Sequence, residues 1–181
     1  MTSRAFVLLA VVLFACAAAG WSQETRLMSF EMEDQFGVVH SDEEYRGQVV
    51  VVMAGDRKGA RHTVAWGRAM IEAMDPSVNL SRVRYIQVAD LKSVPSVGRK
   101  TVRKKFPQDE TQWSLLDWQG RWAKTYDFEK KAANILVFDT SGNLLVHAHG
   151  KEPDEAQARA LADAIKTAVE GADTIVPGGD D

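Results

Sequence analysis

The stretch VVVVMAGDRKGARHT, residues 49–63, decides how the rest of the sequence is interpreted. It begins with Val49–Met53, an unbroken and mostly β-branched apolar run, which is typical of a central strand covered on both faces. A short polar loop follows, and from Ala60 the apolar residues change to a helical period. A loop held between a buried strand and the start of a helix is a common position for functional residues.

Size and composition indicate one globular domain behind an export signal. The chain has 181 residues, of which 45% are apolar and 26% charged, as expected for a soluble fold with a real core. The net charge of −3 argues against a dedicated polyanion binder, so we expect no nucleic-acid partner. The charge is uneven, since residues 23–48 hold seven acids and two bases, whereas residues 92–105 hold six bases.

The first twenty residues have the features of a secretory signal peptide. Arg4 supplies a positive start, Ala5–Ala15 is a short apolar run, and small residues follow up to Gly20. The apolar run is too short to cross a membrane comfortably. We therefore expect an exported, periplasmic protein with a folded domain at 24–171 and a disordered acidic tail at 172–181.

The only cysteine of the chain, Cys16, lies inside this leader. Leu13–Cys16 resembles a lipobox, although Phe14 departs from the small residue usually found there. Cys16 is thus a candidate lipidation site that would tether the protein to a membrane. Ordinary cleavage after Ala19 or Gly20 would release the protein instead. Under either outcome the folded domain has no free thiol.

Apolar periodicity predicts the remaining elements. The helix from residue 60 to 74 is expected to pack on the sheet through Val64, Gly67, Ile71 and Met74, with Trp66 and Met70 beside that stripe. We expect further strands at 29–34, 83–88, 113–118, 134–139 and 144–149, a basic helix at 97–106, and a last helix that starts at Pro153 and stops at Gly171. This order predicts an α/β sandwich with a mixed sheet, in which the crossovers are parallel and the last hairpin is antiparallel.

Several motifs resemble those of peroxiredoxins and related redoxins. The sequences FEMEDQFG at 30–37 and YRGQVVV at 45–51 resemble the first segment of these proteins. LLD at 115–117 with AKTY at 123–126, and then ILVFDTSG at 135–142, resemble the later part. The resemblance implies a thioredoxin-like sandwich, with a mixed central sheet and helices on both faces.

A closer similarity is to the exported, cysteine-free YtfJ-type family, whose biochemical function is unknown. It is carried by Ala54–Gly55 at the strand end, the connection through residues 100–106, and KKAAN at 130–134.

The chemistry of redox-active redoxins is missing from this chain. These proteins place a cysteine at the N-terminus of the helix after the central strand, where the helix dipole and free N–H groups stabilise a thiolate. In such proteins a cysteine pair would fall near positions 57 and 60, and a cis-proline near position 133. This chain has Arg57, Ala60 and Ala133 there, and neither cysteine nor proline. We therefore predict neither thiol–disulfide exchange nor thiol peroxidase activity, no catalytic residue of this kind, and no cofactor.

The segment that replaces the redox motif is cationic. Free N–H groups at the helix start, a glycine that allows close approach, and nearby cations favour a carboxylate, phosphate or sulfate, or an acidic partner surface. The alternative is that Asp56 caps the helix while the cations point into water. The candidate residues for binding an anion or a partner are Arg57, Lys58, Gly59, Arg61 and His62.

Two weaker candidates lie elsewhere. The basic helix presents a positive face that suits anionic lipid head groups or an acidic partner, or is simply solvated; its residues are Arg99, Lys100, Arg103, Lys104 and Lys105. His147 and His149 point the same way on a strand, but a metal site needs three or four ligands. Because no third ligand is evident, we predict no metal site.

Three functions remain open at this stage. The first is an exported, non-catalytic binding module for an envelope protein or a small anion. The second is a non-thiol enzyme that uses His62, or an Asp/Arg pair of the loop, on a small anionic substrate. The third is a cysteine-free accessory to an envelope redox system. We favour the first, since nothing in the sequence brings together a set of catalytic residues.

Overall fold

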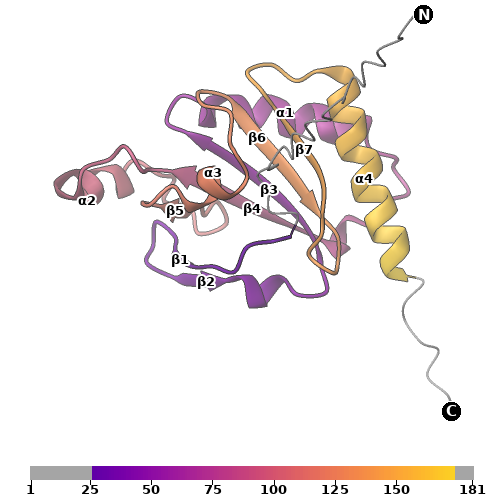
Figure 1. Cartoon of the computed structure of the whole chain (residues 1–181), viewed down its shortest axis with the longest axis horizontal. Coiled ribbons are helices and arrows are strands. Elements are labelled where there is room, and N and C mark those ends of the chain that lie inside the picture. Colours follow the sequence, from indigo (N-terminus) through magenta and orange to yellow (C-terminus); the bar gives the residue numbers. More distant parts are fainter. Residues whose placement is uncertain (1–25, 174–181) are drawn as a thin grey trace, which may run out of the picture.

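The computed structural model describes residues 26–173 and contains a five-stranded mixed sheet in the order β5-β4-β3-β6-β7 (Figure 1). The central strand β3 (Val49–Asp56) pairs in parallel with β4 (Val83–Asp90), and β4 pairs in parallel with β5 (Leu115–Asp117). On its other side β3 pairs antiparallel with β6 (Ala133–Phe138), which pairs antiparallel with β7 (Leu144–Gly150). The predicted mixed sheet is therefore present.

The predicted signal peptide, the candidate lipidation site Cys16 and residues 174–181 of the predicted tail lie outside the described residues.

The apolar run that begins β3 is buried on both faces, as predicted. Val50 and Val52 lie in one core cluster, and Val49 and Val51 in the other. Each of these four side chains is at most 1% exposed. Alternating side chains of one strand thus join the two layers that cover the sheet.

One face of the sheet is covered by α1 (Ala60–Ala73) and α4 (Glu155–Asp173). The fully buried Trp66 of α1 donates its indole N–H to the carbonyl oxygen of Gly150 at 3.0 Å, which ties this helix to the end of β7. α4 starts at an N-cap, because the Asp154 carboxylate accepts the backbone N–H of Gln157 at 3.0 Å.

The opposite face is covered by the hairpin of β1 (Glu31–Glu33) and β2 (Val39–Ser41), by η1 (Asp42–Tyr45), and by the short helix α3 (Arg121–Thr125). Trp122 of α3 is fully buried there, against Phe30 with ring centroids 5.4 Å apart. Figure 1 shows this hairpin and α1 on opposite sides of the sheet. Helices therefore lie on both faces.

The connection between β4 and β5 leaves the sheet and contains η3 (Ser96–Gly98) and α2 (Arg99–Arg103). In Figure 1 this segment protrudes at one extreme of the molecule, away from α4. A further 3₁₀ turn, η2 (Leu80–Arg82), precedes β4. Among residues 26–173, no helix has both the length and the apolar character that crossing a bilayer requires.

The predicted packing face of α1 is wrong for Val64 and Ile71, although Gly67 and Met74 of the same stripe do pack inward. Val64 is 69% and Ile71 47% exposed, whereas Trp66 and Met70 are almost completely buried. With 3.6 residues per turn, the buried face lies about 100° around the helix from the predicted stripe. The larger Trp66 and Met70 fill the space between the sheet and α4, while Gly67 faces Met53.

Smaller differences concern the ends of helices. The single basic helix expected at 97–106 is a 3₁₀ turn followed by five α-helical residues, and Val97 is 91% exposed. α4 starts at Glu155 rather than Pro153 and continues through Gly171 to Asp173. The domain boundary predicted at residue 171 thus falls inside a helix.

Candidate binding site after the central strand

Asp56 ends β3 and holds the loop that starts α1. One carboxylate oxygen accepts the backbone N–H groups of Lys58 and Gly59, both at 2.8 Å, and the other accepts the N–H of Lys131 at 3.0 Å. Burial raises the pKa of Asp56, but these three donors and the charge of Lys131 outweigh burial and hold the pKa below its ordinary value. A carboxylate of the chain thus occupies two backbone N–H groups in the turn that leads into α1.

Gly59 is required by the protein's own backbone. A Cβ atom at this position would lie 2.1 Å from the carbonyl oxygen of Ala132 and 2.8 Å from its carbonyl carbon. The sequence interpretation of this glycine, as an opening for a bound anion, is therefore corrected, because Ala132 fills the space beside it.

The segment that packs on Gly59 is itself fixed by a buried amide. The Asn134 side chain donates to the carbonyl oxygens of Glu129 and Ala132, at 3.0 and 3.3 Å, and accepts the N–H of Glu129 at 2.8 Å. Ala133, at the position where a cis-proline was sought, begins β6, and residues 26–173 contain no cis peptide bond. The loop after β3 and the segment before β6 are thus joined by the Asp56–Lys131 hydrogen bond and by the packing of Gly59 on Ala132.

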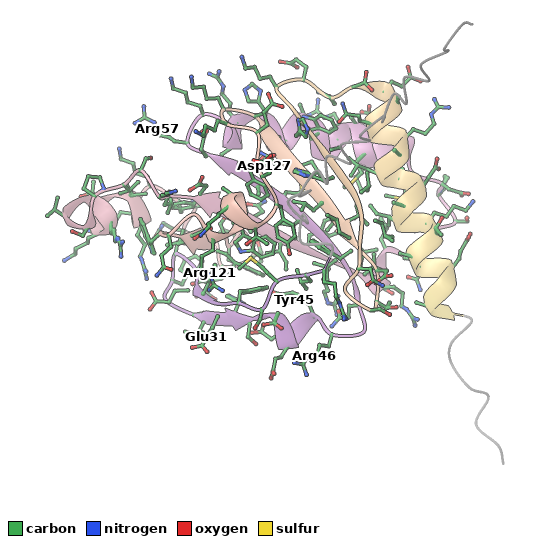
Figure 2. The ribbon with its side chains drawn as sticks, viewed as in Figure 1. Glu31, Tyr45, Arg46, Arg57, Arg121 and Asp127 are labelled. Carbon is green, nitrogen blue, oxygen red and sulfur yellow. The ribbon has the colours of Figure 1, made fainter. Side chains whose placement is uncertain are left out.

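The cations of the Asp56–His62 segment remain on the surface. Arg57 and Lys58 are exposed, and neither forms an ion pair within the described part of the chain. Arg61 is also exposed, and its Nε donates to His62 Nε2 at 3.2 Å. Figure 2 shows the Arg57 side chain extending from the loop away from the sheet. Arg57, Lys58 and Arg61 are thus exposed around the start of α1, and Arg61 contacts His62 there.

An apolar groove of about 630 Å³ lies beside this loop. Its walls come from residues 55–60, from residues 89–95 after β4, and from the α2 region at residues 98–106. Half-buried Val94, Val102 and Phe106 line it, and Arg57 and Lys105 stand in its walls. Crevices at the carboxyl ends of parallel strands are a common position for ligands in α/β sheets. Sequence reasoning missed this groove because its walls come from three separate segments.

The basic residues of the α2 region do not form one uniform solvated face. The Arg99 guanidinium lies 5.1 Å from the ring centroid of Trp118, and Arg103 donates to Glu33 at 2.7 Å. Lys105 lines the apolar groove. Lys100 and Lys104 are exposed, with no ion pair among residues 26–173. Two of the five predicted surface cations therefore stabilise the domain itself.

The histidines of β7 bind neighbouring protein groups. His147 Nε2 lies 3.2 Å from the side-chain oxygen Oδ1 of Asn134, and His149 Nδ1 lies 2.5 Å from a carboxylate oxygen of Glu129. Burial, followed by the nearby His149, lowers the pKa of His147 to about 4, so this ring is neutral at pH 7. No group of three or more His, Cys, Asp or Glu side chains in the described residues is arranged to hold a metal ion.

The arrangement of sheet, hairpin and helices is shared with known structures. The exposed lipoprotein thioredoxin of Streptococcus pneumoniae superposes with a TM-score of 0.56 over 77% of this chain and 99% of its own, at 15% identity. The chain has the thioredoxin-like fold.

Two other structures agree. BsSco, a member of the Sco family of cytochrome c oxidase assembly proteins, gives a TM-score of 0.52 over 83% of this chain and 95% of its own, at 16% identity. The thioredoxin domain of a thiol-disulfide oxidoreductase from Bacteroides vulgatus gives 0.51 over 82% and 98%, at 12% identity. No protein-family model matches the sequence, and no curated protein does. The resemblance to the YtfJ-type family therefore stays a prediction.

Within this fold, the Asp56–His62 segment runs from the last residue of β3 to the first turn of α1. The chain has one cysteine, Cys16, and none between residues 26 and 173. The domain is thus consistent with a redoxin scaffold that has lost its redox motif.

Proposed function

We propose that the protein is an exported, non-catalytic binding module whose Asp56–His62 segment recognises a protein partner in the cell envelope. One observation carries this proposal. Next to the positions where a redoxin would hold its cysteines, the Asp56 carboxylate binds three backbone N–H groups of the chain, while Arg57 and Lys58 are exposed and form no ion pair in the described part.

A protein partner fits this surface better than a small anion. A small anion at the helix start binds through backbone N–H groups, and in the turn before α1 those of Lys58 and Gly59 already bind Asp56. Ala132 also closes the space beside Gly59. The outward cations and the apolar groove instead offer charge and apolar area to a larger surface, and interfaces commonly combine both.

Export is part of the proposal, because a partner in the cell envelope can be bound only by a protein that leaves the cytoplasm. Its support is the predicted signal peptide at residues 1–20. Lipidation at Cys16 would add a membrane tether but would leave the recognition surface unchanged. The loss of cysteine also suits an accessory role beside an envelope redox enzyme, in which binding occurs without electron transfer.

Affinity capture with a charge-matched control tests the proposal. The bait is the protein without its predicted signal peptide, residues 21–181, in three forms: wild type, Arg57→Glu with Lys58→Glu, and Lys151→Glu with Arg159→Glu. We expect wild type and the second double variant to recover the same envelope protein in about equimolar amount, and the loop variant to lose it. Equal recovery by all three forms, or no stoichiometric protein with wild type, contradicts the proposal.

A further inference from the structure

α1 exposes a stripe of four side chains with alternating chemistry: Arg61, Val64, Arg68 and Ile71. Their spacing of three, four and three residues places them on one side of the helix. Val64 and Ile71 are 69% and 47% exposed, and both arginines are exposed. Because Trp66 and Met70 occupy the sheet-facing positions, these two β-branched residues have no place in the core.

The charge along this stripe has one sign. Arg68 forms no ion pair within residues 26–173, and Arg57 and Lys58 continue the positive charge beyond the first turn. The one acid of α1, Glu72, lies one turn after Arg68 at the edge of the stripe, and it also lines a groove to which α4 contributes acids. The stripe therefore presents apolar side chains among cations.

We propose that Arg57, Arg61, Val64, Arg68 and Ile71, together the α1 face, bind an acidic amphipathic helix of a partner protein. The proposal rests on the proposed function and deepens it by naming the chemistry of the partner. Apolar side chains of that helix cover Val64 and Ile71, and its flanking carboxylates face Arg61 and Arg68. From residue 61 to 71 the stripe spans about 15 Å, so about three turns of a partner helix cover it.

Charge complementarity and spacing both favour this occupant. The 3-4-3 spacing aligns all four side chains along one line of the helix, as at the contact between two packed helices. In this row Val64 and Ile71 are the apolar positions, and Arg61 and Arg68 are the charged ones. A lipid surface needs a broad basic face, whereas the cations of this stripe form one narrow row beside Glu72. A partner helix needs only the narrow stripe itself.

A designed peptide serves as the probe because it isolates this chemistry. It is a fluorescein-labelled 21-residue helix with Leu at the seam positions and Glu at the flanking ones, whose like charges oppose self-pairing. A matched peptide carries Lys in place of Glu. Fluorescence anisotropy gives Kd, and amide chemical shifts of the isotope-labelled protein (residues 21–181) locate the contact.

We expect the Glu peptide to bind, to shift amides of residues 57–72, and to lose about five- to tenfold in affinity on Arg68→Glu and on Ile71→Ser. We expect the Lys peptide not to bind. Arg159→Glu on α4 is the control and leaves Kd unchanged. Because Arg68 and Ile71 are exposed, their variants keep the wild-type melting temperature, which separates loss of binding from loss of folding.

Several results would overturn the proposal: no binding of the Glu peptide, equal binding of the Lys peptide, or shifts confined to residues 99–105. Sedimentation that shows self-association through the α1 face, abolished by Ile71→Ser, would make a second copy the occupant and would also overturn it. If Arg68→Glu and Ile71→Ser still capture the envelope protein that Arg57→Glu with Lys58→Glu loses, this inference fails while the proposed function stands.

Discussion

Replacing Gly59 by alanine tests whether this glycine belongs to the fold. Its φ of −75° and ψ of −37° are ordinary helical values, so alanine meets no backbone strain there. The added methyl group would nevertheless lie 2.1 Å from the Ala132 carbonyl oxygen. To restore van der Waals contact, the two backbone segments would have to separate by more than about 1 Å, and Asp56 and Asn134 hold both of them in place.

The size of the effect follows from two opposing contributions. Overpacking of this kind costs about 1–3 kcal/mol, and the higher helix propensity of alanine returns less than about 1 kcal/mol. We expect Gly59→Ala to lower the free energy of unfolding by about 2 kcal/mol. For a domain of this length, that lowers Tm by about 4–8 °C.

Urea and thermal unfolding of residues 21–181, followed by circular dichroism, measure this change. Gly171→Ala in α4 is the matched control, because a Cβ there meets nothing within 4 Å. The control is expected to be as stable as wild type or more stable by up to about 1 kcal/mol. If Gly59→Ala proved as stable as wild type, the packing argument for this loop would be refuted.

For three further substitutions, the structure sets the direction in which stability changes. Asp56→Ala should lower the free energy of unfolding by about 1 kcal/mol at pH 7. Because the fold lowers the pKa of Asp56 from 3.8, the difference in stability between wild type and variant should shrink as the pH falls below 3.8, which urea titrations at several pH values measure. His147→Gln should flatten the pH dependence, since burial holds the pKa of His147 at about 4 against 6.5, and wild type therefore loses stability as pH falls from 6.5 towards 4. Trp66→Phe should cost about 1–2 kcal/mol in urea unfolding, because the Gly150 carbonyl loses its donor.

The parts of the fold that the sequence predicted are those with strong local signals. The β-branched run from Val49 identified the central strand, and the Thr140–Asn143 turn identified the hairpin of β6 and β7 within one residue at each end. β2 and α3 were not predicted, since three and five residues are too few to show a period.

Long-range packing explains what the sequence could not predict. Val64 and Ile71 are as apolar as the residues that are buried, and only the positions of the sheet and of α4 decide that Trp66 and Met70 face inward. From sequence alone, a glycine at a helix start is compatible with close approach either of a ligand or of a neighbouring backbone segment. In this fold the neighbour is Ala132, which is distant in sequence and therefore could not be predicted.

The candidate site was predicted in part. Its location after the central strand and its cations follow from one continuous stretch of sequence. The alternative that Asp56 caps the helix is not met as stated, because the N-cap is Gly59 and Asp56 binds the turn before it. The groove that Val94, Val102 and Phe106 line depends on the path of the connection through α2, which no local pattern determines.

Site-specific crosslinking in the producing cell tests the central claim most directly. A photoreactive amino acid replaces Lys58 in one full-length form and the exposed Leu145 of β7 in another, as the control. A discrete adduct with one envelope protein at position 58, and none at position 145, is the result that this account predicts. No adduct at position 58 while position 145 crosslinks to a protein would contradict it.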